Sequence, residues 1–387
     1  MVSSTEVLMK ISVLQENLAK GLSIVSRAVE NRPTMPVLGN VLLQTEDARL
    51  RLAAINMTLG MGITCRIGAK VEQHGAVTLP SKTFADLVNN LSPEKVELEL
   101  DDATQTMHLR CGGTKANIKG IDADEFPPVR TDGTGDFVVE GKILKEMILQ
   151  TVFAAATEDA RPILTGVYVR LEGNTLTMAA ADGYRLAVRT TKLDQEFANP
   201  VEMVIPAKSL AEVARIISDE DSEVLITLPG EQNLVMFHMK NVDVSSQLLE
   251  GKFPDFTAII PKTYSTATVM YTSELLRACQ RAEIFARDSA YSGRLYVTPP
   301  RGPGEPGEVK VASSSTERGD NEGIVDASVE GEPLDISFNI KYLIDVLRVI
   351  PDERVVLQSN GSANPGVIRP ENRDDFIHVI MPMSMTR

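Results

Sequence analysis

The sequence predicts an α+β protein of three repeated domains, in which helices pack on antiparallel sheets. One lysine-bearing segment occurs three times, it recurs at nearly constant spacing, and alternating strand segments surround two helical segments in every copy. The segment reads LPSKTFADLVNNL from Leu79, IPAKSLAEVARII from Ile205 and FNIKYLIDVLRVI from Phe338. Each copy has a lysine at its fourth place and an acidic residue four places later.

The spacing of the copies defines the expected domains. Lys82 and Lys208 are 126 residues apart, and Lys208 and Lys341 are 133 residues apart. The segments LRLAA, LTMAA and VKVAS follow nearly the same offsets. We therefore expect domains at 1–130, 137–262 and 263–387, with a short tail at 1–8. Polar, turn-rich linkers are expected at 127–136 and 261–267.

Two helices are expected in every copy. The first helices are predicted at 15–29, 142–154 and 273–287, and the second at 81–91, 207–217 and 341–350. Strand patterns such as GVYVRL and TLTMAAADGYRLAVRTT lie between them, and Asp182-Gly183 is a strong hairpin signal. Strand pairs alternating with isolated helices favour helices on one face of an antiparallel sheet.

The helices carry an apolar stripe opposite a basic one. In the segment 207–217, Leu210 is followed at helical spacing by Val213, Ala214 and Ile217, while Lys208 and Arg215 lie on the other face. The segment 341–350 repeats this with Leu343, Val346, Leu347 and Ile350 opposite Lys341 and Arg348. The sequence therefore predicts sheet-packed helices with outward basic residues.

Charge is distributed unevenly. The whole chain has a net charge of −14, yet the six helices together carry +5, so the remainder carries −19. Lysine and arginine often do no more than solvate an outward helix face. None of the six helices has a negative net charge, and this favours a local surface that attracts phosphates. Such a surface would contact a nucleic-acid backbone without recognising its bases. The basic residues expected on this surface are Lys20, Arg27, Lys82, Lys142, Lys145, Lys208, Arg215, Arg277, Arg281, Lys341 and Arg348.

Few chemical motifs are present. The sequence lacks GxSxG, HExxH, CxxC and GxxxxGK[ST], and its three cysteines and four histidines are scattered. We expect no catalytic residue, metal or cofactor. No apolar run approaches the ~20 residues of a membrane helix, and the cysteine usage favours a reducing cytoplasm.

The chain resembles the β-subunit sliding clamps of bacterial DNA polymerase III over essentially its whole length. The resemblance is carried by RPTMPVLGNVLL at 32–43, ADGYRLAV at 181–188, GKFPDF at 251–256, FNIKYLIDVL at 338–347 and VIMPM at 379–383. It implies a homodimeric ring that encircles duplex DNA without sequence preference and tethers the replicative polymerase. The helices would line the hole, and Arg32 matches a position that approaches DNA in the family.

The resemblance also implies a site for short peptide motifs of partner proteins. Leucine, isoleucine, proline and methionine suit an apolar groove that accepts several partners. The alternative is that both segments have only a structural role, VIMPM as a core strand and ADGYRLAV as a hairpin. The expected site residues are Leu164, Gly183, Tyr184, Arg185, Leu186, Pro254, Ile259, Val379, Met381, Pro382 and Met383, bordered by Arg161, Asn339 and Tyr342.

Dimerisation is expected through the ends of the chain. Unpaired sheet edges in the first and third domains would invite association. Candidate contacts are Ile118 in the first domain and Ile284 and Phe285 in the third. Implied partners are the polymerase subunit, a clamp loader and other proteins with clamp-binding motifs, and the implied location is the cytoplasm with the nucleoid.

Two other functions fit parts of the sequence. A protein-only scaffold could use the same repeat without encircling DNA, and it would show a neutral or acidic lining. An enzyme on a duplicated α+β fold would show a buried polar cluster with perturbed ionisation.

Overall fold

All six predicted helices form in the computed structural model, which describes residues 7–384 apart from 31, 132, 159, 231, 301, 303 and 304. The helices are α1 Gln15–Val25, α2 Ser81–Asn89, α3 Gly141–Val152, α4 Ala207–Ile216, α5 Thr272–Ala286 and α6 Ile340–Val349. The first is shorter than predicted, because the chain tightens into the 3₁₀ turn η1 (Ser26–Ala28) after Val25.

The apolar stripes of the helices are buried as predicted. In α4, Leu210, Val213 and Ala214 are buried while Lys208 is exposed. In α6, Leu343, Val346 and Leu347 are buried in the same way. Apolar residues three and four apart thus fix which face of each helix meets the sheet, and they leave the basic residues outside.

The chain forms two compact units, described here separately. The first contains the chain up to Leu144 and then Glu212–Leu248. It holds a five-stranded antiparallel sheet with the order β5 (Lys70–Gln73), β1 (Val7–Leu14), β7 (Lys95–Asp101), β8 (Thr106–Cys111) and β9 (Thr114–Lys119). Its second sheet has eight strands, in the order β10 (Phe137–Glu140), β13 (Glu223–Thr227), β14 (Leu234–His238), β15 (Val242–Gln247), β4 (Met61–Gly68), β3 (Arg49–Asn56), β2 (Asn40–Glu46) and β6 (Ala76–Pro80).

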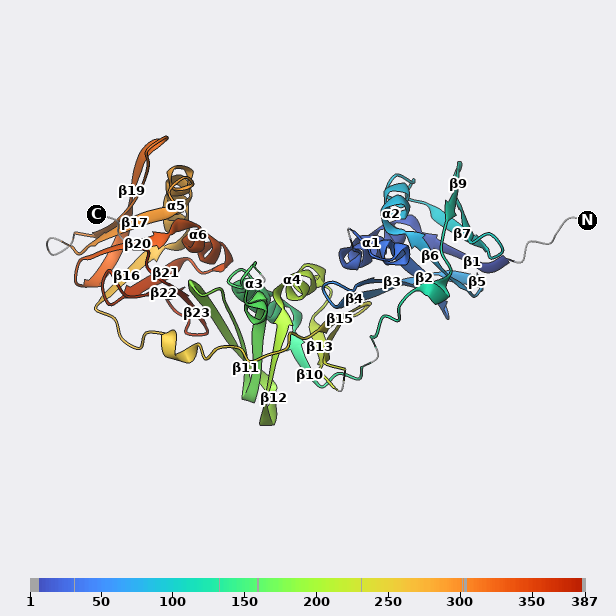
Figure 1. Cartoon of the computed structure of the whole chain (residues 1–387), viewed down its shortest axis with the longest axis horizontal. Coiled ribbons are helices and arrows are strands. Elements are labelled where there is room, and N and C mark those ends of the chain that lie inside the picture. The colour runs from blue at the N-terminus through green and yellow to red at the C-terminus, as the bar shows by residue number, and fades with distance from the viewer. Residues whose placement is uncertain are drawn as a thin grey trace, which may run out of the picture. The chain divides into compact units, whose positions relative to one another are not determined.

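The helices of the first unit cover one part of the eight-stranded sheet. α1 packs on β3 and β4, and α2 packs on α1 and β6 (Figure 1). The hydroxyls of Ser26 and Ser81 lie 3.0 Å apart at the contact between the two helical segments.

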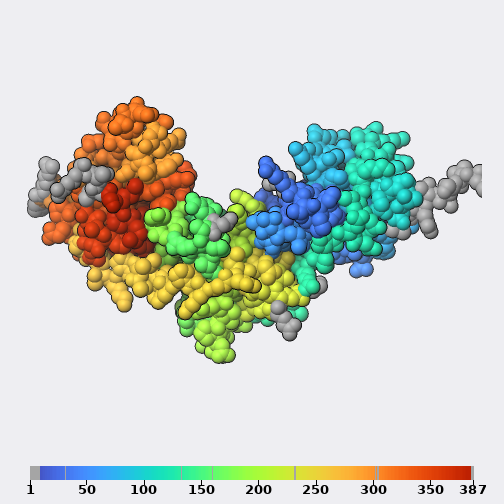
Figure 2. All heavy atoms as spheres, viewed as in Figure 1, coloured from blue at the N-terminus to red at the C-terminus, as the bar shows by residue number. Residues whose placement is uncertain are grey.

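The second unit contains Lys145–Ala211 and the chain from Leu249 onward. Its sheet has ten strands, in the order β11 (Gly166–Ala181), β12 (Arg185–Pro206), β23 (Phe376–Ile380), β22 (Gly366–Pro370), β21 (Arg354–Ser359), β16 (Thr266–Tyr271), β19 (Gly319–Gly331), β18 (Gly307–Ser315), β17 (Ser292–Thr298) and β20 (Leu334–Asn339). α5 packs on β17, β18 and β19 and against α6. In Figure 2 the orange and red residues of this part form one closely packed body.

Both large sheets join strands from two copies of the repeat. In the first unit β15 pairs with β4, placing Val244 opposite Ile63. In the second unit β12 pairs with β23, placing Leu186 opposite Val379. Each copy therefore contributes strands to a sheet that continues into the next copy.

The ends of the chain are only partly described. β1 already pairs with β7 from Val7, which lies opposite Asp101, so a tail extending to residue 8 was wrong at its last two positions. The remainder of that tail and the last three residues of the SMTR ending lie outside the described part. Among the described helices, none is long and apolar enough to cross a membrane.

Candidate functional site

The predicted hairpin at Asp182-Gly183 forms between β11 and β12. Asp182 accepts hydrogen bonds through Oδ1 from the backbone N–H groups of Tyr184 (2.9 Å) and Arg185 (3.0 Å). Gly183 has a φ of 97°, which an L side chain rarely adopts. The turn fixes the direction in which Tyr184 and Arg185 leave the sheet.

Arg185 is held on three sides. Its Nε donates to Asp182 at 3.0 Å, and its Nη1 donates to Asp345 on α6 at 2.7 Å. The guanidinium carbon lies 4.2 Å from the centre of the Tyr342 ring, also on α6. Its side chain is only 10% exposed, so these contacts compensate a largely buried charge.

The carboxyl-terminal strand β23 completes this surface. Leu186 and Val379 pack together with Ala179, Val188 and Val367. The backbone N–H of Met381 donates to the carbonyl of Tyr184 at 2.9 Å, which continues the pairing beyond the strand. Val379 itself is buried, as the core-strand alternative expects, whereas Met381 is 43% exposed.

Aromatic residues that the sequence analysis did not select form the centre of the surface. The Tyr168 ring stacks on Phe253 at 5.5 Å, and Phe256 meets both rings edge-on. These residues connect the Leu186 cluster to Leu164, which packs with Phe253 and Val204. Burial raises the pKa of Tyr168 to about 12, so its phenol stays neutral. The motif GKFPDF could have pointed to this aromatic cluster, since it places Phe253 and Phe256 on either side of Pro254 and Asp255.

The remaining predicted residues lie around this centre. Arg161 donates to the carbonyl of Asp182 at 3.3 Å. Asn339 caps α6 by accepting from the N–H of Lys341. Tyr184 and Ile259 are exposed, Pro254 is exposed beside the aromatic residues, and Pro382 is half-buried. Met383 turns toward β20, where its N–H donates to the carbonyl of Ser337. We call the surface around Arg185, Leu186, Phe256 and Met381 the docking surface.

The basic residues expected to face DNA lie outside the core of each unit. Eleven of the twelve are exposed, and Lys145 is half-buried. The first unit carries Lys20, Arg27, Arg32, Lys82, Lys142 and Arg215, and the second carries Lys145, Lys208, Arg277, Arg281, Lys341 and Arg348.

Three of these basic residues have acidic partners that the sequence analysis did not anticipate. Arg27 donates to Glu212 at 3.2 Å, and Arg215 donates to the other oxygen of the same carboxylate. Lys20 lies 3.8 Å from Glu220, although both side chains are well exposed. Part of the basic helix surface is therefore neutralised within the protein.

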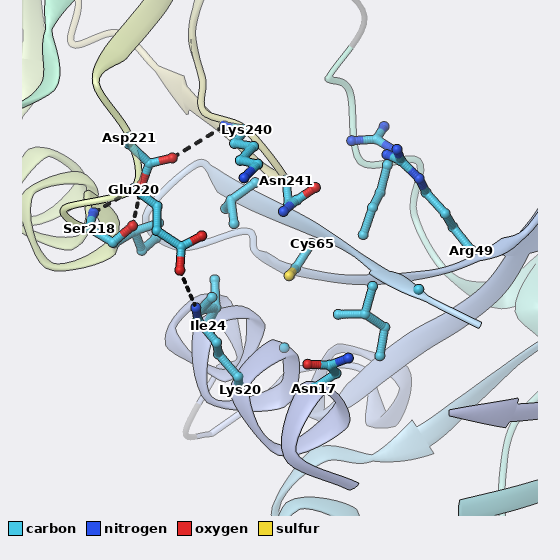
Figure 3. A pocket seen from close by; sticks show the side chains of 16 residues that line it. Asn17, Lys20, Ile24, Arg49, Cys65, Ser218, Glu220, Asp221, Lys240 and Asn241 are labelled. Carbon is cyan, nitrogen blue, oxygen red and sulfur yellow. Dashed lines mark hydrogen bonds and ion pairs between the residues drawn. The ribbon is translucent and has the colours of Figure 1, made fainter. Parts of the chain in front are cut away.

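The pair of Lys20 and Glu220 borders a pocket of the first unit (Figure 3). The pocket has a volume of about 470 Å³ and lies among α1, β4, the segment after α4 and the turn before β15. Asp221 accepts from the hydroxyl and the N–H of Ser218 and from the N–H of Lys240, which fixes one wall. Cys65 also lines it, and burial raises the pKa of this thiol to about 11.

The candidate dimer residues differ in exposure. β9 lies at an edge of its sheet, but the side chain of Ile118 on this strand is buried (6% exposed). Alternation along the strand turns Ile118 toward the core, so its part in a dimer interface stays a prediction. On the third copy Ile284 is exposed and Phe285 is half-buried. Ile324 on β19, which the sequence analysis missed, is also exposed.

The repeated α+β domains and the exposed basic helix faces are the features expected of the clamp class of proteins. Matches to known proteins agree with this class. Three family models match the chain: the N-terminal domain of the DNA polymerase III beta subunit at residues 9–130, its central domain at 138–255 and its C-terminal domain at 257–384. The chain belongs to the DNA polymerase III beta subunit family.

Relatives and solved structures cover nearly the whole chain. The Beta sliding clamp of Bacillus subtilis is 33% identical over 97% of this chain and 99% of its own length. That of Haemophilus influenzae is 32% identical over 97% and 100%. The crystal structure of the DNA polymerase sliding clamp from Bacillus subtilis is similar with a TM-score of 0.90 and 30% identity, covering 98% of this chain and 100% of that one.

Proposed function

We propose that two copies of this chain form a ring around duplex DNA and tether the replicative DNA polymerase to it. The chain is a sliding clamp by its family, a processivity factor rather than an enzyme. One observation carries the proposal for this chain: the helices expose basic residues, although the protein as a whole is acidic. Such a lining attracts the phosphate backbone weakly and without sequence preference, so encirclement supplies the retention.

Three domains per chain, at 1–130, 137–262 and 263–387, are part of the proposal. The family-model matches at 9–130, 138–255 and 257–384 support these boundaries. The ring would close through the ends of the two chains. The open edge at β9 supports one side of this contact, and the exposed Ile284 and Ile324 support the other.

The docking surface would take short peptides from partner proteins. Its exposed Met381 and Tyr184 lie next to the buried Leu186 and Val379, which gives a peptide apolar side chains to contact. The polymerase subunit, a clamp loader and other proteins with clamp-binding motifs are the proposed partners. With such partners, the protein would act in the cytoplasm on nucleoid DNA.

Topological retention gives a direct test. Protein assembled on a circular plasmid should migrate with the plasmid in gel filtration, and a single double-strand cut should release it. Blocking both ends of the cut plasmid with a tightly bound protein should restore retention. Equal retention on circular and open-ended linear DNA would contradict encirclement.

A further inference from the structure

Glu212 on α4 lies between two arginines that the proposed function directs toward DNA. Its Oε2 accepts from Arg27 at 3.2 Å, and its Oε1 accepts from Arg215. The two arginines come from different copies of the repeat, since Arg27 belongs to η1 and Arg215 to α4. All three residues belong to the first unit.

The exposure of the three side chains shows which of them is the centre of the cluster. Glu212 is 18% exposed, whereas Arg27 is 38% and Arg215 is 59% exposed. The carboxylate is thus partly covered by the two guanidinium groups, each of which still reaches water. Both carboxylate oxygens are engaged, an arrangement that a DNA phosphate could also offer to two arginines.

We infer that Glu212 is a positioning residue that acts as a built-in counterion for Arg27 and Arg215 and so weakens the hold of the clamp on DNA. This inference rests on the proposed function. A basic residue that the protein already neutralises brings less positive charge to a phosphate, and so it displaces fewer of the cations that are condensed on DNA. A ring that is retained by topology needs mobility along the duplex, and weak contacts with the backbone allow it.

The use of this position differs among the three copies of the repeat. Glu212 is the acidic residue four places after the repeated lysine Lys208. Its counterpart Asp345 binds Arg185 of the docking surface, and its counterpart Asp86 is exposed. The bridge to two DNA-facing arginines is therefore a property of Glu212 rather than of the helix motif.

A second acidic residue makes a weaker contact of the same kind. Glu220 lies 3.8 Å from Lys20 at the edge of the pocket in Figure 3, and both side chains are more than 60% exposed. Water and salt screen such a pair strongly. Glu220 thus provides an internal comparison in which the same neutralisation should matter less.

The inference is tested by the salt dependence of DNA binding. The affinity of the full-length protein for a short fluorescent duplex is measured over a series of salt concentrations, with Glu212→Gln beside wild type. Each freed arginine should make the slope of log K against log[salt] more negative by about 0.9, so the slope should steepen by about 1 to 2. Glu274→Gln makes the same charge change in the first turn of α5, outside the cluster, and should leave the slope near that of wild type. Glu220→Gln should fall between them.

A double-mutant cycle separates release of the arginines from a general gain of charge. Arg27→Gln should reduce the slope more in the Glu212→Gln background than in wild type, because only there is Arg27 free. Thermal melting of each variant checks that it is folded. If wild type shows a salt-dependent affinity and Glu212→Gln has the same or a shallower slope, the counterion role is wrong and the DNA-facing assignment stands. If wild type itself shows no salt dependence, the proposed DNA-facing surface fails and the inference fails with it.

Discussion

Asp345 accepts a hydrogen bond from Nη1 of Arg185 at 2.7 Å, although the two residues are 160 positions apart in the chain. The contact joins α6, which also carries Lys341 and Arg348, to the hairpin of the docking surface. The same arginine lies over the ring of Tyr342 one turn earlier on α6. One helix therefore presents basic residues outward and holds the docking surface with its acidic and aromatic residues.

Asp345→Asn should weaken peptide binding. Arg185 would lose one charged partner and keep Asp182, so its guanidinium would no longer be fixed on Tyr342. A hydrogen bond to a charged group contributes about 1.5–3 kcal/mol, and we expect at least about a tenfold loss of affinity for a Leu/Phe-containing peptide. Fluorescence anisotropy with a labelled peptide measures it.

Asp86→Asn is the matched control, since it makes the same change at the equivalent position of the first copy, where the side chain is exposed. It should leave peptide affinity unchanged. Unaltered peptide affinity in Asp345→Asn would show that Arg185 does not need this partner.

The double variant Met381→Ala, Met383→Ala should lose peptide binding and polymerase stimulation. Each truncated apolar contact at a binding hot spot costs about 1–3 kcal/mol. Met381 is exposed beside the hairpin, and neither methionine belongs to the basic helix faces, so retention on circular DNA should persist. If melting temperature falls together with peptide affinity, the two residues act as core; equal affinity in variant and wild type would exclude them from the docking surface.

The periodicity of apolar residues predicted the helices well, but the sequence did not predict which strands of different repeat copies pair with each other. The stripe of Leu210, Val213 and Ala214 lies within ten residues and depends only on helical periodicity, so the segment 207–217 matched α4 closely. The pairing of Leu186 with Val379 joins segments far apart in the chain, and strand alternation alone does not select its partner. The aromatic centre escaped for a similar reason, because Tyr168 reaches Phe253 only through the fold.

Ion pairs were the least predictable part of the basic surface. The sequence gives each arginine a full positive charge, but the bridge from Arg27 to Glu212 spans 185 positions. The burial of Ile118 was also not predictable. The sequence placed its strand near a sheet edge, but it did not say which face of the strand is buried. In the structure Ile118 lies opposite Met107 on β8, and both side chains are buried.

Charge reversal on the helices should impair retention on DNA. Replacing Lys208, Arg215, Lys341 and Arg348 by glutamate puts negative charge where phosphates are expected, and all four side chains are exposed, where substitutions cost little stability. Loading or retention on circular plasmid at low salt should drop while the melting temperature is kept. Reversal of the exposed Lys70, Lys95, Lys115 and Lys192 changes the net charge equally, away from the helices. A similar loss with this control set would mean that overall charge, and no defined lining, controls retention.

Arginine at Ile284 and Ile324 should break the dimer. Both are large apolar residues exposed on the third copy, and a charged side chain in a closed interface would be buried without a partner. Light scattering should give the mass of one chain at micromolar concentration for the variant, and the mass of two chains for wild type.

Ile259→Arg is the control. Ile259 is also about half exposed but lies beside the docking surface, so this variant should remain dimeric and lose peptide binding. A wild-type mass of one chain would contradict the ring.

Acid should destabilise the protein through His378, which lies on β23 with its ring centre 5.3 Å from that of Phe153. Burial, with the nearby charge of Arg185, lowers the pKa of His378 from 6.5 to about 3. The folded protein therefore keeps this imidazole neutral, while the unfolded chain takes up a proton below pH 6.5. The free energy of unfolding is therefore unaffected by His378 above pH 6.5 and decreases as the pH falls toward 3. The decrease is on the order of 2 kcal/mol by pH 5.

Urea unfolding at pH 7 and pH 5 should show this loss in wild type and a smaller one in His378→Phe. His74→Gln, at an exposed position, should behave as wild type. An equal pH dependence in His378→Phe and wild type would mean that His378 does not contribute to acid sensitivity.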